Sequence, residues 1–174
     1  MKQIILLISL ISSIFTFNSR EDSNSLQDRI SGGWTLIGGS SKVAYFDVEN
    51  NLIEERLLPL NVSGTILNVG ENNLLIRNNK NALSLVDYTL SEINNAEGNL
   101  DVKVCPSIDD TEIISLINNK NLELSRDNNK TLFLSADFDK SGTSKLLDNT
   151  IAYNHAKVLM VFKKNSFFSD ILPY

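Results

Sequence analysis

The sequence has 174 residues, 42% of them hydrophobic, and a formal net charge of −5, which fits one globular domain with its own core. An acidic chain is repelled by nucleic acid and by anionic membranes, so we exclude both as partners. The single cysteine excludes an internal disulfide.

Residues 1–19 have the form of a secretory signal peptide. A basic residue precedes an uncharged apolar run from Ile4 to Phe17, and charged residues return at Arg20. The run is shorter than the roughly 20 apolar residues that a transmembrane helix needs, although an uncleaved anchor is the alternative. We therefore predict a secreted protein, or one of the periplasm or cell surface, with no transmembrane anchor after cleavage. Residues 20–31 are polar and predict a flexible lead.

Residues 32–164 have the pattern of a β-rich domain. Short apolar runs alternate with turn residues, and asparagine pairs such as Asn50-Asn51 fall between the runs, where turns tolerate left-handed backbone. Trp34, with glycine pairs on both sides, is predicted to be a structural residue that closes one end of a barrel or sandwich. The early runs lie at 34–37, 43–48, 52–60, 61–68, 74–77 and 82–90. We predict an α+β fold: a small, mainly antiparallel β domain of roughly nine strands, barrel-like or sandwich-like, with one short helix packed on the sheet.

The predicted helix lies within the stretch from Leu100 to Phe138. A strand ends at Cys105, and Asp109 followed by Glu112 has the capping-box spacing of a helix start. Apolar residues then recur at spacings of three and four until position 118, which gives one apolar stripe that must lie against the sheet. Two more strands follow. Cys105 is predicted to be a structural, buried small hydrophobe, and an intermolecular bridge is the alternative.

Motifs for catalysis and metal binding are scarce. His155 is the only histidine, so a Ser-His-Asp or Cys-His arrangement would have to use it, and a strand-end histidine without a role is the simpler interpretation. The segment 137–142 copies only the first half of a calcium-binding loop, which favours an ordinary turn. We predict no enzyme activity, no catalytic residue, no metal and no cofactor. Asn61 and Asn129 begin N-x-Ser/Thr sequons, which a eukaryotic host could glycosylate.

Several short motifs occur in a recognisable order: a Gly-x-Trp-x-Leu opening, a strand ending in Cys-Pro, a helix with an acidic start and a closing Leu-x-x-Phe. The residues are Gly33–Leu36, Val62–Gly64, Asn68, Val104–Pro106, Glu112, Leu116, Leu132–Leu134 and Leu159–Phe162. This order resembles the META domain, a family that includes the bacterial heat-shock protein HslJ and secreted or surface proteins of protists. The resemblance implies an exported or envelope-associated, non-enzymatic protein, tied to stress or drug tolerance in bacteria and to virulence in parasites.

The chain departs from the family pattern at three places. Where the family has Gly-Cys-Asn, only the asparagine is kept, at Leu67-Asn68. Asp101 and Lys103 stand where the family has Thr and Met before its later cysteine. Residues 139–154 have the character of an insertion before the last strand.

Two other families share parts of the pattern. A lipocalin-like carrier also starts with Gly-x-Trp and holds a small apolar ligand in its barrel, but a long helix follows its last strand. A cystatin-like inhibitor of cysteine proteases has an N-terminal glycine followed by a long helix, which Gly38-Gly39 disfavours here. The function that we expect is contact with another protein or with the cell envelope.

The sequence ends in an apolar tail, residues 165–174. Phe167, Phe168, Ile171 and Leu172 make it too apolar to lie in water without a reason. We predict that the tail folds back over an open edge of the domain, and a partner-docking peptide is the alternative.

Intact-mass analysis of protein from the culture medium should find a chain that begins after the run from Ile4 to Phe17, because that run has the length of a signal-peptide apolar core. A mass that includes these residues would favour the uncleaved anchor.

Overall fold

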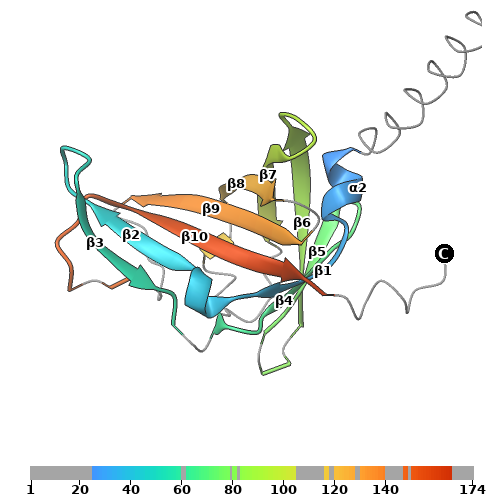
Figure 1. The fold of residues 1–174 in the computed structure, drawn as a ribbon, viewed down its shortest axis with the longest axis horizontal. Helices are drawn as coiled ribbons and strands as arrows, with labels where there is room; N and C mark the ends of the chain where they lie inside the picture. The colour runs from blue at the N-terminus through green and yellow to red at the C-terminus, as the bar shows by residue number, and fades with distance from the viewer. Residues whose placement is uncertain are drawn as a thin grey trace, which may run out of the picture.

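The computed structural model describes residues 25–59, 62–78, 80–81, 83–104, 116–117, 120–127, 130–139, 147–148 and 150–165 (Figure 1). This part of the chain contains ten strands, a short helix α2 and a 3-10 helix η1. Their bounds are α2 Leu26–Ile30, β1 Gly32–Leu36, η1 Gly38–Ser40, β2 Lys42–Phe46, β3 Leu52–Leu57, β4 Ile66–Val69, β5 Asn73–Arg77, β6 Leu83–Glu92, β7 Glu97–Val104, β8 Asn121–Asp127, β9 Thr131–Asp139 and β10 His155–Lys164. The predicted fold class, a small and mainly antiparallel β domain with a short helix, is confirmed, and of the two predicted architectures it is the barrel.

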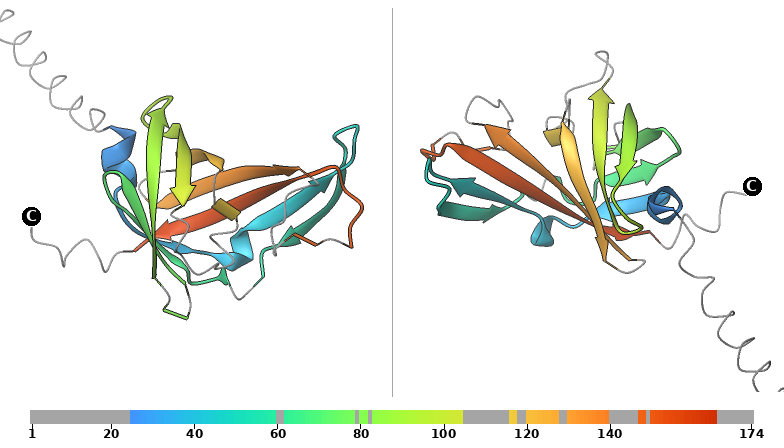
Figure 2. Two further views of the ribbon diagram at one scale, coloured as in Figure 1. Left: turned by 180° about the vertical axis from the view of Figure 1, so that it is seen from behind. Right: turned by 90° about the horizontal axis from the view of Figure 1, so that it is seen from above.

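Eight of the strands form a closed antiparallel ring in the order β1-β4-β5-β6-β7-β8-β9-β10, and β10 pairs with β1 to close it. The remaining two strands form the β2–β3 hairpin. β1 and β2 pair with the same edge of β10: β1 pairs with the end of β10, and β2 pairs with its first half. Figures 1 and 2 show this hairpin and the first part of β10 projecting away from the ring. Only three residue pairs close the ring: Trp34 with Lys164, Thr35 with Lys163, and Leu36 with Phe162.

Strict alternation of inward and outward side chains gives the barrel its core. In β6, Ser84, Val86 and Tyr88 point inward and are buried, whereas the side chains between them are exposed. Successive residues of a strand point to opposite faces, so one face of each strand can be apolar while the other meets solvent. The inward residues of all eight ring strands join one hydrophobic cluster, which extends under β2.

Trp34 lies fully buried at one end of the barrel. Its indole Nε1 donates a hydrogen bond to the carbonyl oxygen of Ile30 at 2.6 Å, and the Nζ atom of Lys164 lies 5.3 Å from the ring centroid. A buried indole needs such an acceptor, so the segment before β1 is tied to the core.

That segment differs from the flexible lead predicted for residues 20–31, because residues 26–30 form helix α2. The Ser25 side chain caps it by accepting from the amide of Asp28 at 3.2 Å, and Leu26 and Ile30, one turn apart, are both fully buried. Gln27 Nε2 donates to the carbonyl of Gly70 in the β4–β5 turn at 3.0 Å. The helix therefore closes this end of the barrel, and a short amphipathic spacing outweighs the polar composition of the segment.

Other differences concern the ends of elements. β4 begins at Ile66 rather than at residue 61, because residues 62–64 form a turn in which Gly64 has φ +81°. The segment predicted as an insertion, 139–154, begins inside β9, and its described residues Leu147 and Tyr153 are buried in the core beneath β2. Of the helix predicted at 109–118, only residues 116–117 are described, and these are helical.

Trp34→Phe should lower the free energy of unfolding by about 1–3 kcal/mol, because the buried carbonyl of Ile30 loses its donor while most of the apolar ring remains. Urea unfolding measures this change. Thr35→Val, at the outward-facing neighbouring position, is the control and should stay within about 0.5 kcal/mol of wild type. Equal stability of Trp34→Phe and wild type would contradict the role given to this hydrogen bond.

Candidate functional site

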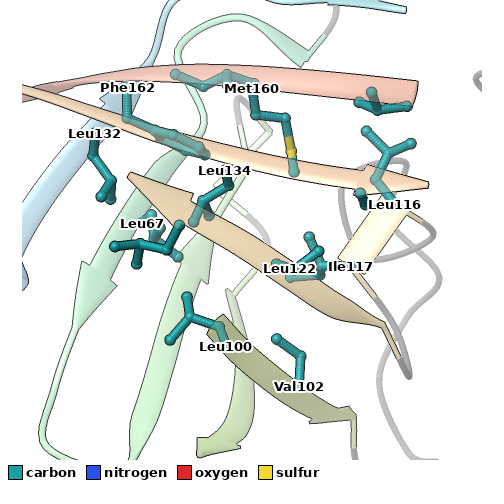
Figure 3. Close-up of a cluster of buried hydrophobic side chains, with 14 of the residues drawn as sticks. Leu67, Leu100, Val102, Leu116, Ile117, Leu122, Leu132, Leu134, Met160 and Phe162 are labelled. Carbon is teal, nitrogen blue, oxygen red and sulfur yellow. The ribbon is translucent and has the colours of Figure 1, made fainter. Parts of the chain in front are cut away.

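The barrel interior is filled by side chains. Leu116 and Ile117, from the connection between β7 and β8, are buried in the same cluster as the inward residues of the strands (Figure 3). The void that remains at this place is about 10 Å³, the size of one water molecule at most. Its lining residues are Thr65, Leu67, Leu74, Ile76, Ile117, Leu122, Leu134, Met160 and Phe162. A void of this size has no room for a drug-sized ligand, which needs roughly 300 Å³ or more.

His155 lies at the first position of β10, on the outer face of the projecting hairpin. Its ring stacks on that of Phe46 with centroids 4.8 Å apart and planes 6° apart. Its cross-strand neighbours are Phe46 and Asp139. This arrangement, a histidine stacked on an aromatic ring beside a strand-end carboxylate, differs from the hydrogen-bonded hydroxyl, imidazole and carboxylate of a catalytic triad.

The other residues singled out in the sequence are placed as follows. Asp137 and Asp139 belong to strand β9, and no group of three or more metal-ligating side chains forms among the residues that the structure describes. Cys105 and the sequon residues Asn61 and Asn129 lie outside the described residues. The apolar tail also lies outside them, apart from Asn165.

One concavity is an open, polar groove of about 410 Å³ on the outer wall, across β7, β8, β9 and β10. Its lining residues are Ile93, Glu97, Gly98, Asn99, Glu123, Leu124, Ser125, Phe133, Ser135 and Leu159. The Glu123 carboxylate accepts from Lys157 Nζ and from Ser135 Oγ, both at 2.9 Å. These bonds hold the pKa of Glu123 below its ordinary value, with the Lys157 hydrogen bond as the largest cause. An ionised, salt-bridged carboxylate is not suited to donate a proton at neutral pH.

A second, smaller concavity, which we call the wall groove, has a volume of about 160 Å³ and lies on the outer face of β1, β4, β5 and β6. Gly33, Ile66, Asn68, Leu75, Arg77 and Leu83 line it. Leu83 is 63% exposed and Leu85, beside it on the same strand face, is 53% exposed. The wall groove therefore combines an apolar patch with the guanidinium group of Arg77.

The β2–β3 hairpin is the most exposed apolar element among the described residues. In β3, Leu52, Ile53 and Leu57 are 57%, 43% and 63% exposed, and Val48 at the tip of the hairpin is 76% exposed. β3 pairs with β2 alone, and no described strand covers its other edge. Leu52 lies opposite Phe46, and Leu57 opposite Lys42, on the outer face of the hairpin.

The hairpin is held in a fixed conformation. In its turn, Asp47 Oδ1 accepts from the amide of Asn51 at 2.7 Å, and Asn50 has φ +67°. This backbone hydrogen bond is the largest cause that lowers the pKa of Asp47. On the inner face, Asp148 forms an ion pair with Arg56, and its amide donates to the Tyr45 hydroxyl at 2.9 Å. The exposed apolar side chains are therefore presented on a rigid frame.

Neither the hairpin nor the wall groove was predicted from the sequence as a functional surface. The signal was present in the β3 segment LIEERL, in which apolar residues stand at both ends and the alternation of a half-buried strand is missing. Such a strand has no buried face to specify it, which is characteristic of an exposed edge.

No family model, no curated protein and no solved structure matches this chain. Among the described residues, no helix has the length and apolar character to cross a membrane.

Glu123→Gln should lower the free energy of unfolding at pH 7 by about 0.2–1 kcal/mol, the range of an exposed ion pair. Because folding lowers the pKa of Glu123, its contribution is present above the ordinary value of 4.5 and is lost as the pH falls below it. Folding raises the pKa of Lys157, so the contribution of the pair is also lost above 10.5.

Urea unfolding at pH 3, 7 and 11 measures the difference between wild type and Glu123→Gln, which should be largest at pH 7. Asp87→Asn, an exposed carboxylate in β6, is the matched control. A difference that does not change with pH would contradict the assignment to this ion pair.

Proposed function

We propose that this chain is an exported, non-enzymatic protein, similar to the META domain, that works by binding another protein through its β2–β3 hairpin. The observation that carries the proposal is the open edge of β3, with Leu52, Ile53 and Leu57 exposed beside it. An open edge offers unpaired backbone donors and acceptors to an added strand, and exposed apolar side chains stabilise that strand by burial. Envelope contact through the same hairpin is the related alternative.

The partner that fits this surface is an extended segment of a protein with apolar side chains on one face. Added to β3, such a segment would lie with those side chains over Leu52, Leu57 and Phe46 on the outer face of the hairpin. The hydrogen-bonded turn and the Arg56–Asp148 ion pair support this proposal, because a rigid binding element loses less conformational entropy on binding.

A carrier function like that of lipocalins has one observation in its favour: eight strands close an antiparallel ring whose first strand carries a buried tryptophan. The filled interior argues against it, since Ile117 and Met160 line a void of about 10 Å³. The cystatin-like alternative needs a long helix after the N-terminal glycine, and the chain after Gly33 instead continues as β1, η1 and β2.

The double variant Leu52→Asn, Leu57→Asn should bind the partner protein much more weakly than the parent. Burial of a leucine contributes about 1.5–3 kcal/mol, so the loss of either contact should weaken binding at least tenfold. A photo-crosslinking residue in place of Ile53 captures the partner from the source fluid or envelope fraction, and quantitative mass spectrometry compares the captured protein between the parent and the double variant.

Ile93→Asn is the matched control, because Ile93 is 67% exposed but lies on the β6–β7 turn, away from the hairpin. It should capture as much partner as the parent. Undiminished capture by the double variant would contradict the hairpin proposal, and a bound lipid in native mass spectrometry of the source protein would favour the carrier.

A further inference from the structure

The wall groove and the end of the last strand meet at one residue, Gly33. The amide of Asn165 donates a hydrogen bond to the carbonyl oxygen of Gly33 at 2.9 Å, and Gly33 lines the wall groove. The chain beyond Asn165 therefore starts beside one border of the groove. Gly33 has no side chain, so at this position nothing projects from β1 between Asn165 and the groove, and Thr35 is the next outward-facing residue of the strand.

The remaining chain is long enough to cross the groove. From β10 over β1, β4 and β5 to β6 there are four strand spacings of about 4.8 Å, or roughly 19 Å. Residues 166–174 are nine residues, which span up to about 30 Å when extended. About six residues are enough to reach the far border at Leu83.

The chemistry of the two surfaces is complementary. The groove is bordered by Ile66, Leu75 and Leu83, and the exposure of Leu83 leaves a large apolar surface in water. The residues after Asn165 supply four apolar side chains and one carboxylate, namely Phe167, Phe168, Ile171, Leu172 and Asp170. The carboxylate suits Arg77, which stands between Ile66 and Leu83 in one cross-strand row.

We propose that residues 166–174 bind in the wall groove of their own chain. In this position they cover the apolar patch of β4, β5 and β6 and cross the seam between β10 and β1. That seam is held by three residue pairs, whereas nine pairs join β10 to β9. The bound segment therefore reinforces the weakest junction of the ring. The proposal is independent of the hairpin function, because it uses the opposite end of β10 and needs no partner protein.

The test uses the full chain and a fluorescent peptide with the sequence of residues 166–174. In the parent protein the tail occupies the groove, so the peptide should bind weakly. In a variant with Phe167, Phe168, Ile171 and Leu172 all replaced by Ser, the groove is open, and the peptide should bind at least tenfold more tightly by fluorescence anisotropy.

Leu83→Glu in the four-serine variant should abolish peptide binding, whereas Leu57→Glu in the same background should not change it. The two leucines are matched, since each is 63% exposed, but Leu57 lies on the hairpin. Equal peptide binding by the parent and the four-serine variant, no binding to either, or binding that survives Leu83→Glu would each overturn the proposal. Sedimentation of the parent as a dimer that Leu83→Glu dissociates would assign the groove to a second copy and overturn it as well. Loss of hairpin binding leaves these outcomes unchanged, so the two proposals fail separately.

Discussion

Strand β10 pairs with two different strands along one of its edges, and the shape of the molecule follows from this constraint. β10 has ten residues and pairs along its length with β9, but on its other side the first half pairs with β2 and the end pairs with β1. A backbone group can join only one partner strand at a time. The sheet therefore divides at the middle of β10 into a closed ring and a projecting hairpin. The Ser41 hydroxyl marks the division, since it accepts from the amide of Val161 at 2.9 Å between the two pairings.

This division also separates two kinds of surface. Inside the ring, every strand contributes apolar side chains, and Leu116 and Ile117 are buried among them. Outside the ring, exposed apolar side chains gather on the outer wall and on the hairpin. The polar groove, the wall groove and the hairpin differ in chemistry, as they offer a salt-bridged carboxylate, an apolar patch with a cation, and an open strand edge, respectively.

The sequence predicted the fold class because the strand signal is local. Alternation in segments such as 83–90 and asparagine at turns, including Asn50 with its positive φ, depend on neighbouring residues only. Helix α2 was not predicted, because its sequence signal consists of only two apolar residues, Leu26 and Ile30, in a polar segment. The choice of barrel over sandwich, and the division of β10, depend on which strands meet across more than a hundred residues of chain. No local pattern records such pairings.

The surfaces were harder to predict than the core for a related reason. Buried positions can be recognised from the periodic spacing of apolar residues. An exposed leucine such as Leu57 or Leu83 is the same residue type as a leucine of the core, so its type does not reveal its exposure. Only the register, which places Leu57 opposite Lys42 and Leu83 opposite Arg77, identifies both as outward-facing. The neighbours of His155, Phe46 and Asp139, likewise depend on placement, since a sequence with one histidine permits many tertiary neighbours for it.

The seam between β1 and β10 has a consequence for the order in which the chain folds. Strands β4 to β10 pair with their successors along the chain, so each hairpin of this meander can form as soon as its second strand is available. The ring itself joins Trp34 to Lys164, and this contact brings together residues near opposite ends of the chain. Closing so long a loop costs more entropy than any local step and must come late. Before β10 is available, β1 and β9 lack the strand that joins them, and the β2–β3 hairpin lacks the strand that attaches it to the sheet, so one strand provides both connections.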